Sequence, residues 1–160
     1  MPGHPPIPIP ETVLDIAQRL EGAGFETWCV GGAVRDHLLG DTNADFDLAT
    51  RATPDEVRAL FRRTVDVGVE FGTVGVLDAG RTLHEVTTFR RDVSTDGRRA
   101  VVAFGATLDE DLARRDFTMN AIAYHPLRQE WRDPFDGVRD IEAKVVRAVG
   151  TPAERFHEDF

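Results

Sequence analysis

Asp45 and Asp47 have the type and spacing that could bind divalent cations. The segment reads as a short strand, in which side chains two positions apart share a face, so both carboxylates are predicted on one face with Phe46 in the core. Along a strand the two acids lie about 7 Å apart, which two cations about 3.5–4 Å apart could bridge. An Asp-x-Asp by itself also fits a solvated turn.

The pair Gly31-Gly32 ends thirteen positions before Asp45, where a short helix over 33–39 is predicted to begin. Glycines there let backbone N–H groups approach an anion, and a helix N-terminus adds partial positive charge. Arg35, one turn into the helix, could reach the same phosphates. The segment predicts a triphosphate site, although a glycine hinge with Arg35 paired to Asp36 explains it equally well.

Glu85 is a third candidate acid, in a strand predicted over 82–89. Alternation places Glu85 on one face with Leu83 and Thr87. If this strand neighbours the Asp45 segment, Glu85 completes a cluster of three carboxylates. A glutamate that faces water from an edge strand is the alternative.

Arg114, Arg115, Asp116 and Asn120 form a fourth group, at the end of a helix predicted over 107–115. Arginine binds phosphate, and Asp or Asn can bond a ribose hydroxyl or a base edge. Asp116 and Asn120 would share a face if the helix continued. Charges at a helix end can also be purely stabilising.

The surrounding elements predict an α+β fold: a small mixed, mostly antiparallel β-sheet with carboxylates on one face and helices on the other. Three capping boxes, at 53–56, 107–110 and 151–154, mark helix starts. Glycine-separated β-branched runs predict adjacent, mostly antiparallel strands. The remaining elements are a helix over 11–21, strands over 25–30, 45–48, 64–67, 73–78, 100–104 and 145–149, a strand or buried continuation at 121–124, and a mobile loop over 90–99.

Composition limits the function further. The 160 residues fit about one domain, and 28 acidic against 19 basic residues give a net charge of −9, the wrong sign for binding nucleic acid mainly through phosphates. The single cysteine, Cys29, excludes an intramolecular disulfide and a cysteine-based zinc site. Without an apolar run of about 20 residues or a signal peptide, a cytoplasmic protein that does not bind membranes is expected. The oligomeric state is not predicted.

Four segments in order, 31–36, 45–50, 85–90 and 114–121, resemble the motifs of the class II tRNA nucleotidyltransferases. That family adds the CCA end to tRNA and includes bacterial poly(A) polymerases. The resemblance covers about residues 25–160 and implies the nucleotidyltransferase head, or palm, fold. It implies that Asp45, Asp47 and Glu85 hold two Mg²⁺ ions, that Gly31, Gly32 and Arg35 hold the triphosphate, and that Arg115, Asp116 and Asn120 contact nucleotide phosphates and sugar.

Two positions depart from the family pattern. The base-reading motif Glu-Asp-x-x-Arg is matched only by Glu158 and Asp159, of which Asp159 is a nucleotide-binding candidate, and impaired nucleotide choice is expected because the arginine is missing. Phe71 stands where the family has histidine. The expected organisation is a flexible Pro-rich arm over 1–10, a catalytic head over 11–150 and the start of a truncated helical neck over 151–160.

The resemblance implies a template-independent transferase that adds C, A or both from CTP and ATP to the tRNA 3′ end and releases pyrophosphate. Most tRNA contacts would come from absent C-terminal domains. A poly(A) polymerase, an A-only or CC-only enzyme, and a short nucleotidyltransferase with a protein or small-molecule acceptor remain alternatives. An inactive fragment that binds nucleotide and metal is a further alternative.

Overall fold

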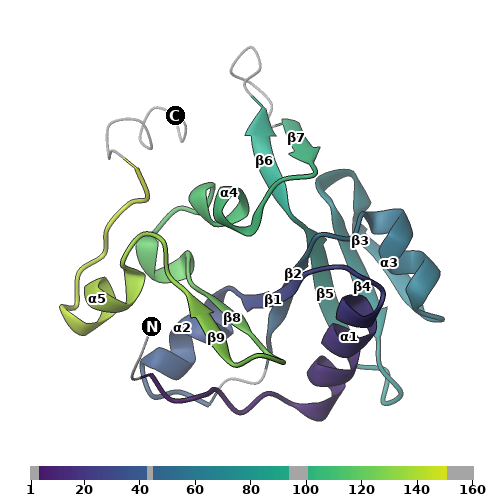
Figure 1. The fold of residues 1–160 in the computed structure, drawn as a ribbon, viewed down its shortest axis with the longest axis horizontal. Helices are drawn as coiled ribbons and strands as arrows, with labels where there is room; N and C mark the ends of the chain where they lie inside the picture. The colour runs from purple at the N-terminus through teal and green to yellow at the C-terminus, as the bar shows by residue number, and fades with distance from the viewer. Residues whose placement is uncertain (1–3, 43–44, 94–100, 151–160) are drawn as a thin grey trace.

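A mixed seven-stranded sheet forms the centre of the computed structural model, which describes residues 4–42, 45–93 and 101–150 (Figure 1). The strand order is β3-β4-β5-β2-β1-β8-β9. Its strands are β1 (Thr27–Val30), β2 (Asp47–Thr50), β3 (Thr64–Gly68), β4 (Thr73–Leu77), β5 (Leu83–Thr88), β8 (Ala123–His125) and β9 (Glu130–Arg132), and β6 (Arg90–Val93) pairs with β7 (Val101–Phe104) in a separate hairpin.

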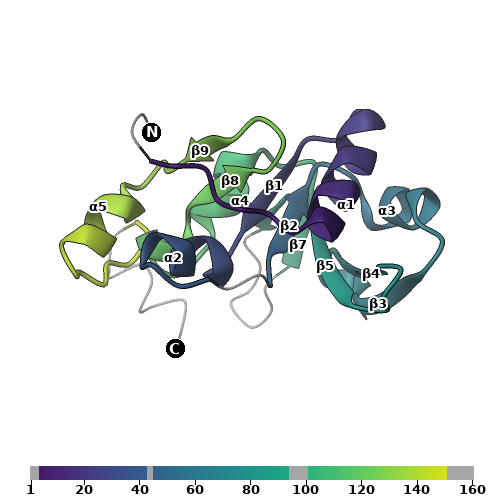
Figure 2. The same cartoon turned by 90° about the horizontal axis from the view of Figure 1, so that it is seen from below.

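Five short α-helices and two 3₁₀ turns connect the strands of the described part of the chain. In Figures 1 and 2, α3 and α5 lie at opposite ends of the molecule. The helices are α1 (Glu11–Gly22), α2 (Gly32–Leu38), α3 (Pro54–Leu60), α4 (Leu108–Ala113) and α5 (Gly137–Glu142), and the turns are η1 (Val69–Phe71) and η2 (Thr118–Asn120).

The pairing of β2 with β5 is the one parallel pairing of the described strands. Its register places Leu48 opposite Val86 and Ala49 opposite Thr87. All other neighbours are antiparallel, so the prediction of a mixed, mostly antiparallel sheet is confirmed. The parallel pair matters for the site because Asp47 and Glu85 come directly before Leu48 and Val86.

Apolar side chains cover both faces of the sheet. The larger cluster joins α1, α2 and α3 to one face and contains Leu48 and Val86, whereas the smaller cluster joins α4 to the other face and contains Ala49. Since side chains alternate along β2, Asp47 lies on the Ala49 face. Helices α1 and α3 therefore lie opposite the carboxylates as predicted, but α4 packs on the carboxylate face itself.

Two of the predicted capping boxes are present. In α3, Thr53 Oγ1 accepts the Glu56 N–H at 3.3 Å, and Glu56 Oε1 accepts the Thr53 N–H at 3.0 Å. Thr107 and Glu110 make the same reciprocal pair at the start of α4, at 3.2 and 3.0 Å. The third box, at 151–154, lies outside the described residues.

Some predicted elements differ from the structure. Strand β6 occupies the first part of the loop predicted over 90–99, where Arg91 and Asp92 are exposed and Arg90 is half-buried, and residues 94–100 lie outside the described part. The strand predicted over 145–149 is wrong, because only Ala148 makes a bridge, to Phe117. Neither β9 nor α5 was predicted. Helix α5 begins without a capping side chain at its N-cap, because Asp133 instead accepts the Gly137 and Val138 N–H groups at 2.7 and 3.0 Å.

The segment before α1 has no helix or strand in its described part, residues 4–10, although Ile7 is buried in the larger core cluster. The His4 ring lies 6.0 Å from the Trp131 ring, centroid to centroid. None of the described helices is long and apolar enough to cross a membrane.

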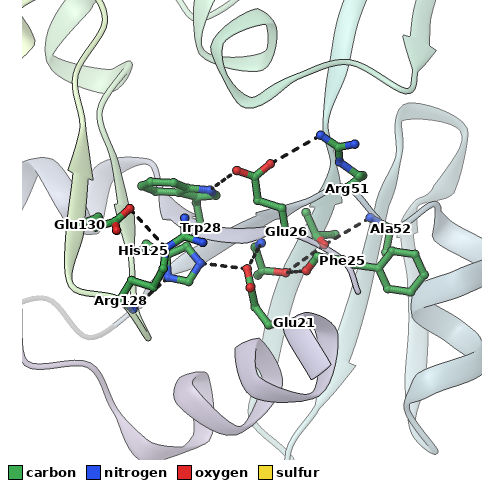
Figure 3. Close-up of polar contacts among 11 residues, drawn as sticks. Glu21, Phe25, Glu26, Trp28, Arg51, Ala52, His125, Arg128 and Glu130 are labelled. Atoms are coloured by element: carbon green, nitrogen blue, oxygen red, sulfur yellow. Dashed lines mark hydrogen bonds and ion pairs between the residues drawn. The ribbon is translucent and has the colours of Figure 1, made fainter. Parts of the chain in front are cut away.

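A buried polar cluster around His125 ties the end of α1 to β1 and β8 (Figure 3). Glu21 Oε2 accepts the backbone N–H of Thr27 at 2.7 Å and lies 2.9 Å from His125 Nε2. His125 Nδ1 accepts the Arg128 backbone N–H at 3.1 Å, so the ring proton is on Nε2 and is donated to Glu21. The His125 ring also meets the edge of Trp28, with centroids 5.0 Å apart. The cluster fixes β1, whose far end leads into Gly31.

Candidate active site

Asp47 and Glu85 are brought side by side by the parallel pairing of β2 and β5. Both line one pocket of about 510 Å³. Loss of solvent around its carboxyl raises the pKa of Asp47 to about 6, and the charges of Glu85 and Asp45 add to this effect while Arg115 opposes it. Loss of solvent first, and the neighbouring like charges second, disfavour the ionised carboxyl, an arrangement that favours a cation or a proton.

Asp45 lies just before β2 rather than inside a strand, which differs from the prediction. Phe46 is nevertheless buried as predicted, and its ring stacks on His37 with centroids 5.4 Å apart. Both aspartates are exposed on either side of it. Within the described residues, no three His, Cys, Asp or Glu side chains are already placed to hold one metal ion.

Gly31 connects the glycine pair to the carboxylates. Its φ of +85° is left-handed, and a Cβ at this position would lie 3.1 Å from Asp47 Oδ2. A side chain would be strained there and would crowd the carboxylate. The glycine therefore allows the Asp47 carboxylate to lie against the backbone that leads into α2.

Arg35 joins α2 to η2. Its Nη1 donates to Asn120 Oδ1 at 2.9 Å, and its Nη2 would lie 3.3 Å from a Cβ at Gly32. The same guanidinium pairs with Asp36 at 3.2 Å. The structure thus brings together Gly32, Arg35 and Asn120, and it also contains the Arg35–Asp36 pair that the alternative interpretation invoked.

Asp116 and Asn120 are neighbours for a different reason from the one predicted. Helix α4 ends at Ala113, so the predicted extension to 115 and beyond is wrong. The 3₁₀ turn η2 instead places Asn120 Nδ2 3.5 Å from Asp116 Oδ1, which also accepts the Phe117 N–H at 2.8 Å.

Arg90 of β6 lines the same pocket as the acids, and so do Arg114 and Arg115, which directly follow α4. Arg115 pairs with the buried Asp111 at 3.6 Å, and Asp111 Oδ1 accepts the Arg90 N–H at 3.1 Å. The Nε atoms of Arg90 and Arg115 are buried and have no hydrogen-bond partner among the described residues. Burial and the charge of Arg114 lower the pKa of Arg90. The part of the pocket that these arginines line is therefore suited to binding an anion.

Sequence reasoning missed Asp111 and gave Arg90 no role. The i,i+4 spacing of Asp111 and Arg115 was a usable signal. The approach of β6 to α4 had no such signal in the sequence, because it depends on tertiary packing. Asp159, predicted to contact the nucleotide, lies outside the described residues and stays a prediction.

The fold agrees with that of known proteins. Residues 27–147 match the model of the poly A polymerase head domain, and the chain belongs to that family. A CCA-adding enzyme of Levilactobacillus brevis is 50% identical over 153 residues, which cover 93% of this chain and 38% of that protein. The corresponding enzyme of Latilactobacillus sakei is 51% identical over 148 residues, or 91% and 37%. The chain thus spans little more than a third of these curated relatives.

Solved structures give the same result. The Bacillus stearothermophilus CCA-adding enzyme in complex with CTP superposes with a TM-score of 0.83 at 45% identity, covering 93% of this chain and 35% of that one. A tRNA nucleotidyltransferase complexed with a primer tRNA and an incoming ATP analog gives a TM-score of 0.67 at 33% identity, covering 84% and 39%. The resemblance to class II tRNA nucleotidyltransferases is confirmed.

Proposed function

We propose that this chain is the catalytic head of a template-independent nucleotidyltransferase. It adds C, A or both from CTP and ATP to the 3′ end of tRNA and releases pyrophosphate. The observation that carries this proposal is the adjacent pair Asp47 and Glu85 in a pocket that Arg90 and Arg115 also line. We also propose that the reaction takes place in the cytoplasm, which the resemblance to tRNA-processing enzymes supports.

The acidic side of the pocket fits Mg²⁺. This ion is typically held by one or two carboxylates, with water and substrate phosphates completing its shell, so three preformed protein ligands are not required. Asp47 and Glu85 would hold it, with Asp45 turning in from the segment before β2. Two such ions would neutralise phosphate charge and favour ionisation of the acceptor 3′-hydroxyl.

The basic side would position the nucleotide. Arg115 lines the same pocket as Asp47 and would bind the phosphates, while Arg35 and the N–H groups of Gly31 and Gly32 would hold the rest of the triphosphate. Asp116 and Asn120 offer an acceptor and an amide for the ribose. This placement would support in-line attack, because phosphoryl transfer depends chiefly on positioning and charge neutralisation.

The direct test is incorporation of labelled CTP or ATP into tRNA that lacks its 3′ end. It should be run on this chain and on the longest natural protein that contains it. Asp47→Ala and Glu85→Ala should each lower kcat by at least about 100-fold, since each removes a carboxylate from the proposed metal site. Asp15→Ala removes an exposed acid of α1 and should match the parent.

Cation binding provides a readout that does not depend on turnover. MgCl₂ should raise the melting temperature of the parent more than NaCl of equal ionic strength does, and Glu85→Ala should reduce that gain. Equal incorporation by the parent and both site variants would refute the catalytic assignment. Incorporation into protein but not into tRNA would favour the alternative acceptor class.

A further inference from the structure

Four exposed apolar side chains lie beside the candidate active site. Val67, Phe71, Leu83 and Phe104 are 40%, 50%, 39% and 39% exposed, respectively, and we call them the apolar strip. Two of them, Val67 and Phe71, line the same pocket as Asp47 and Glu85. Large exposed apolar groups that gather next to a polar pocket indicate a binding surface.

Glycines in the sheet let the strip form. A Cβ on Gly75 would lie 2.5 Å from Leu83 Cδ1 and 2.8 Å from Val67 Cγ2, so these two side chains rest on a bare backbone. A Cβ on Gly72 would lie 2.8 Å from the Phe104 ring. Phe104 ends β7, and the hairpin of β6 and β7 stands beside the β3 end of the sheet in Figure 1.

The Phe71 ring is exposed although its backbone is held firmly. Asp66 Oδ1 accepts the Val69 N–H at 3.0 Å at the start of η1, and the Gly72 N–H donates to the Val69 carbonyl oxygen at 3.0 Å. The Arg90 guanidinium donates to the Phe71 carbonyl. A fixed aromatic ring loses little conformational freedom when a flat partner stacks on it.

We propose that the apolar strip binds the unpaired bases at the 3′ end of the RNA acceptor, with Phe71 as the stacking platform. This inference rests on the proposed function and names a positioning surface for its acceptor. An RNA end is both flat and anionic. The strip offers an aromatic face, and Arg90 at its border offers a cation for the phosphate.

The position of the strip agrees with a role in placing the RNA acceptor near the carboxylates. Phe71 and Glu85 line the same pocket, so a base on Phe71 would place its ribose near the carboxylates. An RNA phosphate could pair with the neighbouring Arg90, from which a purely apolar protein segment would gain nothing, whereas the charge of Glu85 disfavours both occupants. Charge complementarity therefore favours RNA over a second copy of the chain.

The test is fluorescence anisotropy of this chain with two labelled RNA pentamers, without nucleotide or metal. One pentamer carries all its bases, and the other is abasic at its last two positions with the same phosphates. The parent should bind the complete RNA more tightly. Phe71→Ala should weaken that binding by about 5- to 150-fold and leave abasic binding unchanged, since base stacking on one aromatic is worth that factor.

Phe71→Trp keeps an aromatic face and should restore affinity, which separates stacking from a fault in folding. Val146→Ala, an exposed apolar change outside the strip, should behave as the parent. Equal binding of both RNAs, or no loss in Phe71→Ala, overturns the inference. Concentration-dependent dimers that Phe71→Ala abolishes would assign the strip to a second copy and also overturn it.

The binding assay and the incorporation assay test the RNA-binding role and the proposed function separately. Base-dependent binding through Phe71 without nucleotide transfer would refute the proposed function and leave an RNA site. Transfer with an unchanged KM for RNA in Phe71→Ala would keep the proposed function and refute the stacking role.

Discussion

At the scale of single residues, the surroundings of Asp47 disfavour the ionised form of its carboxyl group. Its raised pKa, about 6, arises from loss of solvent and from the charges of Glu85 and Asp45. An acid with a higher pKa in the folded state than in the unfolded state binds more protons when folded. The free energy of unfolding therefore rises as pH falls from about 6 to the ordinary value of 3.8, and the ionised carboxyl destabilises the fold above pH 6.

We expect Asp47→Asn to be more stable than the parent at pH 7.5 in the absence of divalent cations. The gain should shrink between pH 6 and pH 4, because the parent carboxyl takes up its proton there. Urea unfolding of both proteins across this range checks the expectation. A difference independent of pH would show that the substitution acts through packing rather than charge.

The sequence predicted a good part of the site at this scale. Alternation predicted the buried Phe46 between two aspartates, and the order of strand, glycines and helix predicted the glycine pair at the start of α2. The meeting of Asp47 with Glu85 was predicted only on the condition that their strands are neighbours, and the contact of Gly31 with Asp47 was not predicted. Asp111 and Arg90 could not be placed, because their contacts link β6 to α4, and no local pattern specifies how a hairpin packs on a helix. The Arg35–Asn120 bond likewise depends on the turn η2.

At the scale of elements, α4 is the part whose local signals matter most, because it carries Asp111 and leads into Arg115. Thr107→Ala removes the side-chain half of its capping box and should lower the free energy of unfolding by about 0.5–2 kcal/mol. Thr107→Ser keeps the hydroxyl and should lose much less. Urea unfolding monitored by circular dichroism measures both. Equal stability of all three proteins would mean that the cap contributes nothing.

The contact between α5 and η2 has almost no free space. A Cβ on Gly137 would lie 2.1 Å from the Thr118 carbonyl oxygen, a backbone atom that cannot move alone. Gly137→Ala should therefore cost about 3 kcal/mol or more, at the upper end of overpacking effects. It should also weaken nucleotide binding, because Asn120 ends the displaced turn.

Gly22→Ala is the matched control, since nothing lies within 4 Å of its Cβ position at the end of α1. It should be neutral or stabilise by about 0.5–1 kcal/mol through helix propensity. Thermal unfolding and nucleotide titration of both variants provide the comparison. A Gly137→Ala protein as stable as the parent would mean that α5 can shift freely away from η2.

Elements with strong local signals were predicted well, and those without were missed. Helix α3 has its capping box, and the three strands β3, β4 and β5 have β-branched runs between glycines. Strand β9 has only three residues, and the N-terminal N–H groups of α5 are satisfied by Asp133 from outside the helix. Such short, externally stabilised elements carry no periodicity that a sequence could reveal.

At the scale of the whole molecule, Cys29 reports on opening of the sheet. It lies in β1, an interior strand of the sheet, and is fully buried, and burial raises its pKa well above the ordinary value. The folded chain should therefore not react with a thiol reagent at pH 7.5, whereas the urea-unfolded chain should react with one equivalent of that reagent. Rapid labelling of the native protein would show that β1 separates from its neighbours without global unfolding.

The order of strands across the sheet could not be predicted from the sequence. Alternation predicts which side of a strand is buried, but the partner of each strand is chosen by packing between distant segments. The chain gave no local sign that β2 would insert between β1 and β5.

That insertion has a consequence for how the protein is made. Aspartate 47 and glutamate 85 are 38 positions apart, so neither carboxylate meets the other until α3 and the strands between them have been synthesised and docked. A nascent polypeptide on the ribosome thus carries two separated acids that do not yet form the proposed cation site. The proposed Mg²⁺ site therefore exists only in the finished sheet, and binding of the ion there would stabilise the correctly assembled protein over incomplete ones.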